Sequence, residues 1–464
     1  MSGLPKGWAS TEMREVAQIV SGGTPPSKDE SNFQQVGGIP WLTPADLSGY
    51  CNHYIARGAR NLSEKGYAAC SATKMPIGSI LFSSRAPIGY VAIAENEIST
   101  NQGFKSFILP DGFSSSFLYY YLKLIKPVAE QMATGTTFKE LSGAAAAKLP
   151  LLVAPLPEQK RIAYKLDSVL TRVDACRERL DRIPALLKRF RQSILAAATS
   201  GRLTVDWRTG FELEVLAEKY PVSREPSEAP NIPSNWSWVA IGDLAEKVTD
   251  GVHKKPNYVE EGIPFLTVRN LTAGNGIDFS KTSFVSAADH EEFCRRTFPE
   301  RGDLLISKDG TLGVVRLVDT DRPFSIFVSL ALIKLKDKKF SKYMLYALQS
   351  PVLQKQMVGV GTGLLHIHLR DLRQDVVPLP PIDEQHEIVR RVDTLLAFAD
   401  RLEARYAAAR KQVGQLTPAL LAKAFRGELV PQDPADEPAA ELLKRLAVTR
   451  SEAPKTRRGR KVTA

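Results

Sequence analysis

The feature that most constrains this fold is an internal repeat, in which residues 158–203 recur in altered form at residues 384–429. Identical residues stand 226 positions apart along the two copies. The matching pairs are Glu158/Glu384, Gln159/Gln385, Ile162/Ile388, Asp167/Asp393, Asp174/Asp400, Arg179/Arg405, Leu195/Leu421, Ala198/Ala424, Gly201/Gly427 and Leu203/Leu429. A repeat of this kind predicts one structural unit that the chain builds twice.

Each copy of the repeat has the pattern of a long coiled-coil helix. Apolar or small residues recur at alternating spacings of three and four, which places them on one narrow stripe of a helix. In the first copy the stripe comprises Ile162, Leu166, Val169, Val173, Cys176, Leu180, Ile183, Leu187, Phe190 and Ile194. In the second copy it comprises Ile388, Val392, Leu395, Ala399, Leu402, Tyr406, Ala409, Val413, Leu416 and Leu420. About forty residues at ~1.5 Å each predict a helix of roughly 60 Å.

The two helices also have recognisable ends. A proline-rich segment followed by acidic residues precedes each helix, and this order favours a helix start. Gly201 and Gly427 are expected to end the helices, because glycine tolerates the left-handed conformation just after a helix. Pro184 and Pro418 stand inside them and predict kinks or short breaks.

The repeat continues into the segments that precede the helices. Gly38–Thr43 matches Gly262–Thr267, and Gly78–Ser83 matches Gly302–Ser307, both at an offset of 224. Short β-forming runs between glycine, proline and serine predict a mixed domain in each half. Strands are expected at 79–83, 90–94 and 105–109, and helices at 117–131 and 341–356.

We therefore expect an α+β protein, with two pseudo-symmetric α/β domains separated by two long antiparallel coiled-coil helices. The expected order is a first domain at 1–155, a helical segment at 156–205, a linker at 206–230, a second domain at 231–380, a second helical segment at 381–430, and a polar, basic, disordered tail at 431–464. Between the matching segments the two domains differ in their loops. A shared framework with divergent loops predicts one task performed on two different targets.

Charge points to a polyanionic partner. Lys and Arg number 62 and Asp and Glu 51, a net charge of +11, and basic proteins bind nucleic acid through phosphate contacts. A basic surface without a nucleic-acid partner is the alternative on charge alone. No apolar run reaches the length of a membrane span, and the amino terminus lacks the layout of a signal peptide, so we expect a cytoplasmic protein without membrane association.

Motifs of common enzyme classes are missing. The sequence has no Gly-Lys dipeptide and hence no P-loop, no Asn-Pro-Pro or Asp-Pro-Pro followed by an aromatic residue, no Gly-x-Ser-x-Gly and no His-Glu-x-x-His. His366, His368 and His386 could be imagined as metal ligands, but we interpret them as hydrogen-bonding or surface residues. The four cysteines form no Cys-x-x-Cys pair, so a zinc site is not expected. These absences favour a binding protein without a catalytic, cofactor or metal site of its own.

Several motifs resemble those of the specificity subunit of type I restriction–modification enzymes, most closely the type IA branch. The resemblance covers nearly the whole chain and rests on six runs, and several of its motifs recur in order, twice. The six runs are Pro155–Lys160, Lys188–Leu195, Pro380–Gln385, Ala422–Leu429, Ile80–Gly89 and Asn101–Phe104.

The resemblance implies a function and a set of partners. Each domain would be a target-recognition domain for one half of a split double-stranded DNA target, and the helices would fix the gap between the halves. Two modification (methyltransferase) subunits would dock on the chain and carry S-adenosylmethionine. Two restriction (translocase-nuclease) subunits would join them and use ATP and Mg²⁺. The chain would be non-catalytic, and no self-dimer would be required.

Candidate DNA-binding residues lie where the two halves diverge. Their side chains can address base edges or phosphates. In the first domain they are Arg85, Thr136, Thr137 and Lys139, and in the second Arg269, Lys308, Thr362, His366, His368 and Arg370. Trp8 and Trp236 are expected to be core residues.

Two other classes of function stay open at the level of sequence. One is a stand-alone DNA-modifying enzyme with an active site that the motifs do not show. The other is a coiled-coil scaffold that never contacts DNA. Activity of the purified chain would favour the first, and binding insensitive to salt would favour the second.

Overall fold

The structure is a computed structural model that describes residues 3–85, 87–135, 139–209, 220–361 and 365–452. The chain divides into two compact units. Unit 1 comprises Met1–Arg179 and Ala409–Ala464, and unit 2 comprises Leu180–Ala408. Each long helix therefore contributes one part to each unit.

Unit 1 is built around a five-stranded sheet. Its order is β2 (Gln18–Ser21), β10 (Lys105–Ile108), β7 (Ile80–Phe82), β8 (Val91–Ala94) and β5 (Tyr54–Ile55). β10 pairs antiparallel with β2 and β7, and β7 pairs antiparallel with β8. β5 pairs parallel with β8. Shorter pairs join β1 (Ala9–Glu12) to β11 (Pro150–Val153), β3 (Phe33–Gln34) to β6 (Asn61–Leu62) and β4 (Trp41–Leu42) to β9 (Ser99–Thr100). The expected strands are thus present.

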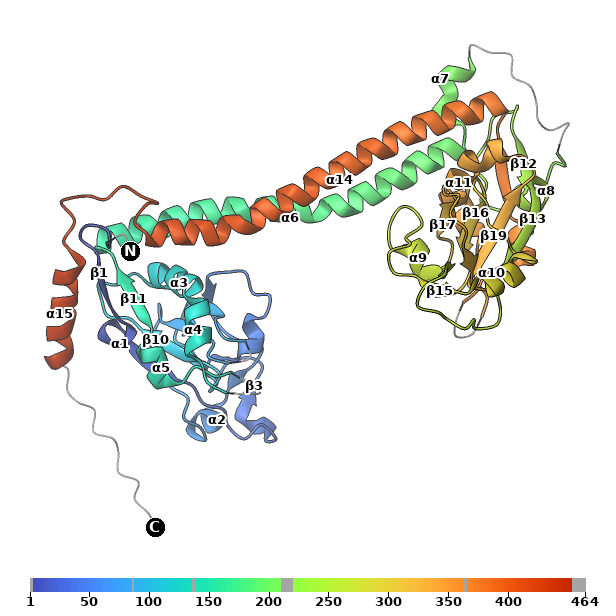
Figure 1. Ribbon diagram of the computed structural model, residues 1–464. Helices are drawn as coiled ribbons and strands as arrows, with labels where there is room; N and C mark the ends of the chain where they lie inside the picture. The colour runs from blue at the N-terminus through green and yellow to red at the C-terminus, as the bar shows by residue number, and fades with distance from the viewer. Residues whose placement is uncertain (1–2, 86, 136–138, 210–219, 362–364, 453–464) are drawn as a thin grey trace. The chain divides into compact units, whose positions relative to one another are not determined.

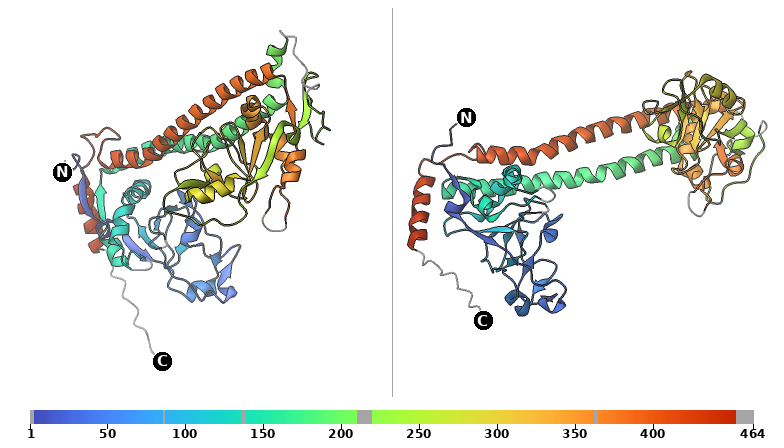
Figure 2. Two further views of the ribbon diagram at one scale, coloured as in Figure 1. Left: turned by 45° about the vertical axis from the view of Figure 1, so that its right-hand side comes forward. Right: turned by 60° about the horizontal axis from the view of Figure 1, so that its bottom comes forward.

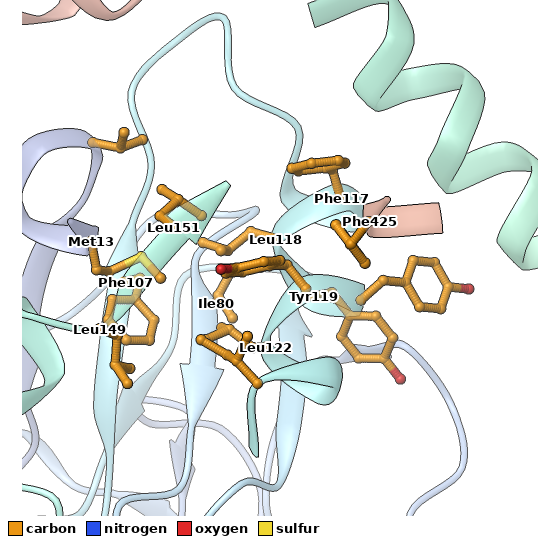
Figure 3. Close-up of a cluster of buried hydrophobic side chains, with 14 of the residues drawn as sticks. Met13, Ile80, Phe107, Phe117, Leu118, Tyr119, Leu122, Leu149, Leu151 and Phe425 are labelled. Atoms are coloured by element: carbon orange, nitrogen blue, oxygen red, sulfur yellow. The ribbon is translucent and has the colours of Figure 1, made fainter. Parts of the chain in front are cut away.

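Unit 1 also contains helices. They are α1 (Met13–Val16), α2 (Glu64–Ala68), α3 (Ser115–Leu124), α4 (Lys126–Met132) and α5 (Gly143–Ala147). The helix expected at 117–131 is therefore split in two, with a proline in the first turn of α4. Aromatic and aliphatic residues of α3 pack on the sheet in one core, together with Phe425 from the second long helix (Figure 3). Trp8 belongs to this core, as expected.

Unit 2 repeats the plan. Its main sheet has the order β13 (Ala245–Asp250), β19 (Leu330–Leu335), β16 (Leu304–Ser307) and β17 (Val315–Leu317). A second sheet joins β15 (Ser283–Val285), β14 (Ile263–Leu266) and β18 (Ser325–Ile326), and β12 (Ser237–Ala240) pairs with β20 (Val376–Leu379). The helices are α8 (Ile241–Leu244), α9 (Val268–Thr272), α10 (Ala287–Cys294), α11 (Ser341–Gln349), α12 (Pro351–Gln356) and α13 (Leu369–Gln374).

The two long helices are α6 (Leu156–Thr199) and α14 (Ile382–Phe425), and each is continuous through its internal proline (Figure 1). Within each unit their segments run antiparallel. In unit 2, Arg191 of α6 pairs with Asp400 and Glu403 of α14, at 2.6 and 2.9 Å. In unit 1, Arg177 donates a hydrogen bond of 2.8 Å to Thr417. The breaks considered at Pro184 and Pro418 are absent from both helices.

Two stripe residues, Cys176 and Leu416, are exposed. The others are buried or half-buried, among them Ile162, Leu166, Val169, Val173, Leu180, Leu187, Ile388, Val392, Leu395, Leu402 and Val413. Leu416 is 42% exposed, so its prediction as a helix-packing residue is wrong. The neighbouring Thr417 contacts α6 instead. An α-helix has 3.6 residues per turn and drifts away from a strict heptad, which moves the contact position by one residue here.

Both helices end at a glycine, as expected. Gly201 has φ +73° and Gly427 has φ +74°, in the left-handed region. A Cβ atom on Gly201 would lie 2.4 Å from the Pro233 side chain, and one on Gly427 would lie 2.5 Å from the Pro5 side chain. Each helix therefore ends against the proline that begins a globular domain of the same unit.

The expectation of a disordered tail is wrong for residues 439–452, which form helix α15 (Ala439–Glu452). Ala439 and Leu442 are buried in the core of unit 1, and the Ala439 amide donates to the Gly7 carbonyl. Figures 1 and 2 show α15 beside the amino-terminal strand β1. This helix was not expected because its polar, charged composition is typical of disorder, whereas Ala439, Leu442, Leu443 and Leu446 pack in or against the core of the domain. The basic residues after 452 lie outside the described part of the chain.

The linker after α6 mirrors the tail. It begins with helix α7 (Val205–Arg208), and Asp206 pairs with Arg391 of α14 at 2.7 Å. In unit 1, Asp436 pairs with Arg161 of α6 at 2.6 Å. Each segment that leaves a long helix is thus held to the start of the other long helix, within one unit. Arg161 and Arg391 therefore both have ion-pair partners within their own units.

The glycine ends give a first prediction. Gly201→Ala and Gly427→Ala should each lower the free energy of unfolding by at least about 1–2 kcal/mol, because an L-residue resists a positive φ. The steric contact with proline adds to this cost. Gly414→Ala is the matched control, because Gly414 lies inside α14 with open space around its Cα. It should stabilise the protein by about 0.5–1 kcal/mol. Urea unfolding followed by circular dichroism tests this, and equal effects of all three changes would contradict it.

Candidate DNA interface

In unit 1 the two divergent loop regions meet at one edge of the main sheet. The first loop follows β7 and the second precedes α5. The Leu141 amide donates to the Ser84 carbonyl at 2.9 Å, and Arg85 lies opposite Glu140 in a β-bridge. Glu140 also exchanges two backbone hydrogen bonds with Thr134. We call residues 83–90 together with the described residues of 134–141 the loop frame of the first domain.

The frame is stabilised by its own serine. The Ser83 hydroxyl donates to the Pro87 carbonyl and accepts from the Tyr90 amide, both at 2.8 Å. The Gly89 amide donates to the Ser83 carbonyl at 3.0 Å. These bonds close the first loop into a compact turn, because the backbone groups of a loop need partners when they lie on the domain.

Unit 2 has the same frame in residues 307–314 and the described part of 360–367. The Ile367 amide donates to the Lys308 carbonyl at 2.8 Å, and Asp309 lies opposite His366 in a β-bridge. His366 exchanges two backbone hydrogen bonds with Val360, and the Val314 amide donates to the Ser307 hydroxyl at 2.9 Å. The backbone frame is therefore common to both domains, while the side chains that it carries differ.

Arg85 is partly exposed in the first loop of the frame. Its side chain is 35% exposed, and its Nη1 lies 3.7 Å from Glu140 Oε2. That distance is short enough for an ion pair but too long for a hydrogen bond. Lys139, beside Glu140, is exposed. Thr136 and Thr137 lie outside the described residues.

Lys308 has a different environment from the one expected. Its side chain is only 12% exposed, and its Nζ lies 3.4 Å from Asp250 Oδ2 and 3.9 Å from Asp309 Oδ2. Asp250 is buried and also pairs with Arg296 at 2.6 Å. The interior position of Lys308 favours a role in holding the frame over direct contact with DNA. Sequence could not show this, because Asp250 is far away along the chain.

The other candidates of the second domain lie in different parts of it. His366 and His368 stack edge to face, with ring centroids 4.7 Å apart. His368 and Arg370, at the start of α13, are exposed. Arg269 is exposed on α9 and lies far from the frame in sequence. Among the described residues, no hydrogen bond or ion pair joins its side chain to the frame. Thr362 lies outside the described residues.

Two frame residues, and a lysine beside the first frame, were missed at the level of sequence. Glu140 and Asp309 are carboxylates, and a search for basic residues passes over them. Lys105, which begins β10, is 7% exposed, and its Nζ lies 3.8 Å from Glu140 Oε1. The signal was present for Asp309, since it matches Arg85 at the offset of 224.

Each domain is fastened to its long helix by a tyrosine and an aspartate. Tyr120 of α3 donates to Asp167 of α6, and Tyr346 of α11 donates to Asp393 of α14. Burial and the aspartate raise the pKa of both tyrosines well above the usual range, so both remain donors at any physiological pH. The two pairs stand at the offset of 226. They hold the domain, and with it the loop frame, at a fixed place on the helix.

A buried glutamate begins each long helix, but its surroundings differ. Glu384 accepts from the Trp236 indole at 2.8 Å and the Thr204 hydroxyl at 2.7 Å, and it also pairs with Arg208. Glu158 is buried beside Trp8 without an equivalent arginine partner at hydrogen-bond distance, and burial raises its pKa. Both tryptophans are therefore core residues, as expected.

Within the described ranges, no group of three or more His, Cys, Asp or Glu side chains could hold a metal ion. A search over the same ranges finds no helix long and apolar enough to cross a membrane.

Comparison with known proteins identifies the family. Residues 5–185 and 233–408 each match the Type I restriction modification DNA specificity domain. The chain belongs to this family. The two matched stretches contain the two loop frames, so each frame lies in its own copy of the domain.

Relatives agree with this assignment. The chain is 32% identical to the EcoBI type I restriction enzyme specificity subunit of Escherichia coli, over 74% of this chain and 73% of the relative. It is 29% identical to the MjaIX specificity subunit of Methanocaldococcus jannaschii, over 83% and 87%. These matches confirm the resemblance found in the sequence.

Solved structures confirm the α+β fold class. The HsdS subunit from Thermoanaerobacter tengcongensis matches with a TM-score of 0.58 at 21% identity, covering 92% of this chain and 98% of that one. A chain from a study of complex assembly and conformational transition of the type I R-M system matches with a TM-score of 0.67 at 21% identity, covering 92% and 100%.

Asp375, which ends α13 just after the second frame, gives a pH prediction. Burial, and then the charge of Asp371, raise the pKa of Asp375 to about 7, and its Oδ2 is buried without a hydrogen-bond partner in the described structure. The folded state thus keeps a proton that the unfolded state releases near pH 4, so stability should fall as pH rises from about 4 to about 7. Asp375→Asn should remove this loss.

Thermal unfolding at pH 5 and pH 8 tests the pH prediction. The Tm of Asp375→Asn should exceed that of the unmodified chain by several degrees more at pH 8 than at pH 5. Asp319→Asn, at an exposed position, is the control and should shift both values alike. A pH-independent difference for Asp375→Asn would contradict the raised pKa.

Proposed function

We propose that this chain is the DNA sequence-recognition subunit of a type I restriction–modification complex and is not itself an enzyme. Each domain recognises one half of a bipartite, asymmetric double-stranded DNA target. The observation that carries the proposal is the pair of loop frames: two copies of one specificity domain keep the same backbone hydrogen bonds and present different side chains. A symmetric homodimer could select only a symmetric target, whereas this chain can select two different halves.

The charge around the frames suits a DNA backbone. Exposed cations include Lys139 in the first frame and Arg370 just after the second frame in sequence, and Lys254 and Lys255 are exposed elsewhere in the second domain. The chain as a whole carries a net charge of +11. Cations of this kind position a protein on phosphates, while loop side chains supply sequence choice.

The remaining parts of the chain serve assembly and spacing. The long helices set the gap between the two half-targets and, with the domains, dock two modification subunits, which carry S-adenosylmethionine and methylate adenine. Two restriction subunits, which use ATP and Mg²⁺, join for restriction of unmodified DNA such as that of phage. No self-dimer is needed, because one chain supplies both recognition domains. A stand-alone DNA-modifying enzyme and a DNA-independent scaffold both lack support in the family assignment.

Methylation mapping tests the proposal. The chain should be expressed together with a cognate modification subunit, in a host that lacks adenine methylation of its own. We expect methylated adenines in one bipartite motif with two short specific halves and a constant gap. The purified chain with S-adenosylmethionine should methylate nothing. Methylation by the chain alone would favour the enzyme alternative, and a methylation pattern independent of the chain would contradict the proposal.

Insertions in the helices test the division of labour. Four residues inserted after Glu178 of α6 and after Ala404 of α14 lengthen both helices by about 6 Å at equivalent positions. The gap in the methylated motif should change, while the bases of both half-targets stay the same. Four residues inserted in the linker at 223–224, outside the helices, are the control and should leave the gap unchanged. A change in the half-target bases would show that the helices take part in base recognition.

A further inference from the structure

The two loop frames carry opposite chemistry at equivalent positions. The first-loop position is Arg85 in one domain and Asp309 in the other, and each lies in a β-bridge with the second loop. The facing second-loop position is Glu140 or His366. A hydrogen-bond donor with positive charge thus stands where the other domain has an acceptor with negative charge.

Neither first-loop side chain, Arg85 or Asp309, uses its hydrogen-bonding groups inside its domain. Arg85 is separated from Glu140 by 3.7 Å and is 35% exposed, and Asp309 is 3.9 Å from Lys308 and 23% exposed. Both distances exceed a hydrogen bond. In the described structure, no recorded hydrogen bond involves the side chain of either residue. Each therefore keeps hydrogen-bonding capacity for a ligand.

A lysine with little exposure lies near the carboxylate of each frame. Lys105 lies 3.8 Å from Glu140, and Lys308 lies 3.9 Å from Asp309 and 3.4 Å from Asp250. Such a lysine offsets the charge of the carboxylate, so that an acid can remain at a surface that meets phosphates. The lysines stand at different places in the two domains, since Ser84 matches Lys308 and Ala331 has the place of Lys105 in the sheet.

Base edges in DNA distinguish these two chemistries. A guanidinium donates two hydrogen bonds to the O6 and N7 acceptors of guanine, and a carboxylate accepts from the exocyclic amino group of cytosine. Because the frames share one backbone, the two side chains are presented in the same way by their domains. The difference between Arg85 and Asp309 is then a difference in the base selected.

We propose that two equivalent positions in each domain determine sequence specificity. They are the first-loop position, 85 or 309, and the second-loop position that faces it, 140 or 366. Arg85 donates to a guanine in the half-target of the first domain, and Glu140 orients its guanidinium. Asp309 accepts from the amino group of a cytosine in the half-target of the second domain. The inference rests on the proposed function and adds the residues and the bases that carry it.

Exchange of the pairs tests this inference in the complex with its modification subunits. One variant is Arg85→Asp with Glu140→His, and the reciprocal variant is Asp309→Arg with His366→Glu. Binding to a DNA library randomised over the target is measured by sequencing. The first variant should lose its preference for guanine at one position of one half-target by about tenfold or more, since a bidentate contact is worth about 1–3 kcal/mol. The other half-target should stay unchanged, and the reciprocal variant should alter only the second half.

Two milder variants keep the test valid if an exchange disrupts folding. Arg85→Lys retains the charge without the two-pronged donor, so the guanine preference should fall while the salt dependence of binding persists. Asp309→Asn is isosteric and should weaken the cytosine preference. Lys139→Ala is the matched control in the second loop, and it should weaken binding to all sequences alike and reduce the salt dependence.

The possible outcomes separate this inference from the proposed function. If the milder variants and the exchanges bind DNA with unchanged base preferences in both halves, the inference is wrong and the proposed function stands. If the unmodified complex shows no sequence preference, the proposed function itself fails. A base preference that changes in the half-target of the other domain would also overturn the assignment of positions to halves.

Discussion

The structure depends on the way each long helix begins inside a globular domain. β11 leads directly into α6, and β20 leads into α14. At each junction a buried glutamine closes the turn: Gln159 donates to the Ala154 carbonyl and Gln385 to the Pro380 carbonyl, both at 2.8 Å. A buried amide without partners would cost free energy, so these bonds fix the direction in which the helix leaves the sheet. Tyr120–Asp167 and Tyr346–Asp393 then hold the domain about two turns further along.

Because each domain is held firmly on its long helix, the side chains of the two loop frames can differ without a change in their support. Each frame closes through backbone hydrogen bonds and a serine hydroxyl, which do not depend on the side chains at 85, 140, 309 or 366. Replacement of those side chains therefore changes the chemistry of the surface without changing its support. A recognition protein gains from this separation, because rigid elements position loop residues more accurately than loops alone.

Sequence reasoning was most reliable where the repeat was strong. The helix ends at Gly201 and Gly427 and the family both followed from residues that match between the halves. It failed where the answer depended on contacts between distant residues. Lys308 was predicted as a DNA-contact candidate, and its side chain lies mostly inside the domain, 3.4 Å from Asp250. Leu416 was placed by a strict heptad, whereas Thr417 makes the contact. The tail was judged by composition, yet Ala439 and Leu442 fill a gap on the first domain.

The sequence by itself determined the duplicated plan, the helical stripes and the places where the halves diverge, because periodicity and spacing are properties of the chain alone. Only the tertiary structure decided which residues face one another across the two loops. Arg85 and Glu140 are 55 positions apart, and Asp309 and His366 are 57 apart. Their meeting depends on how the sheet edge brings two loops together, and burial and charge neutralisation then decide which cations remain available to DNA.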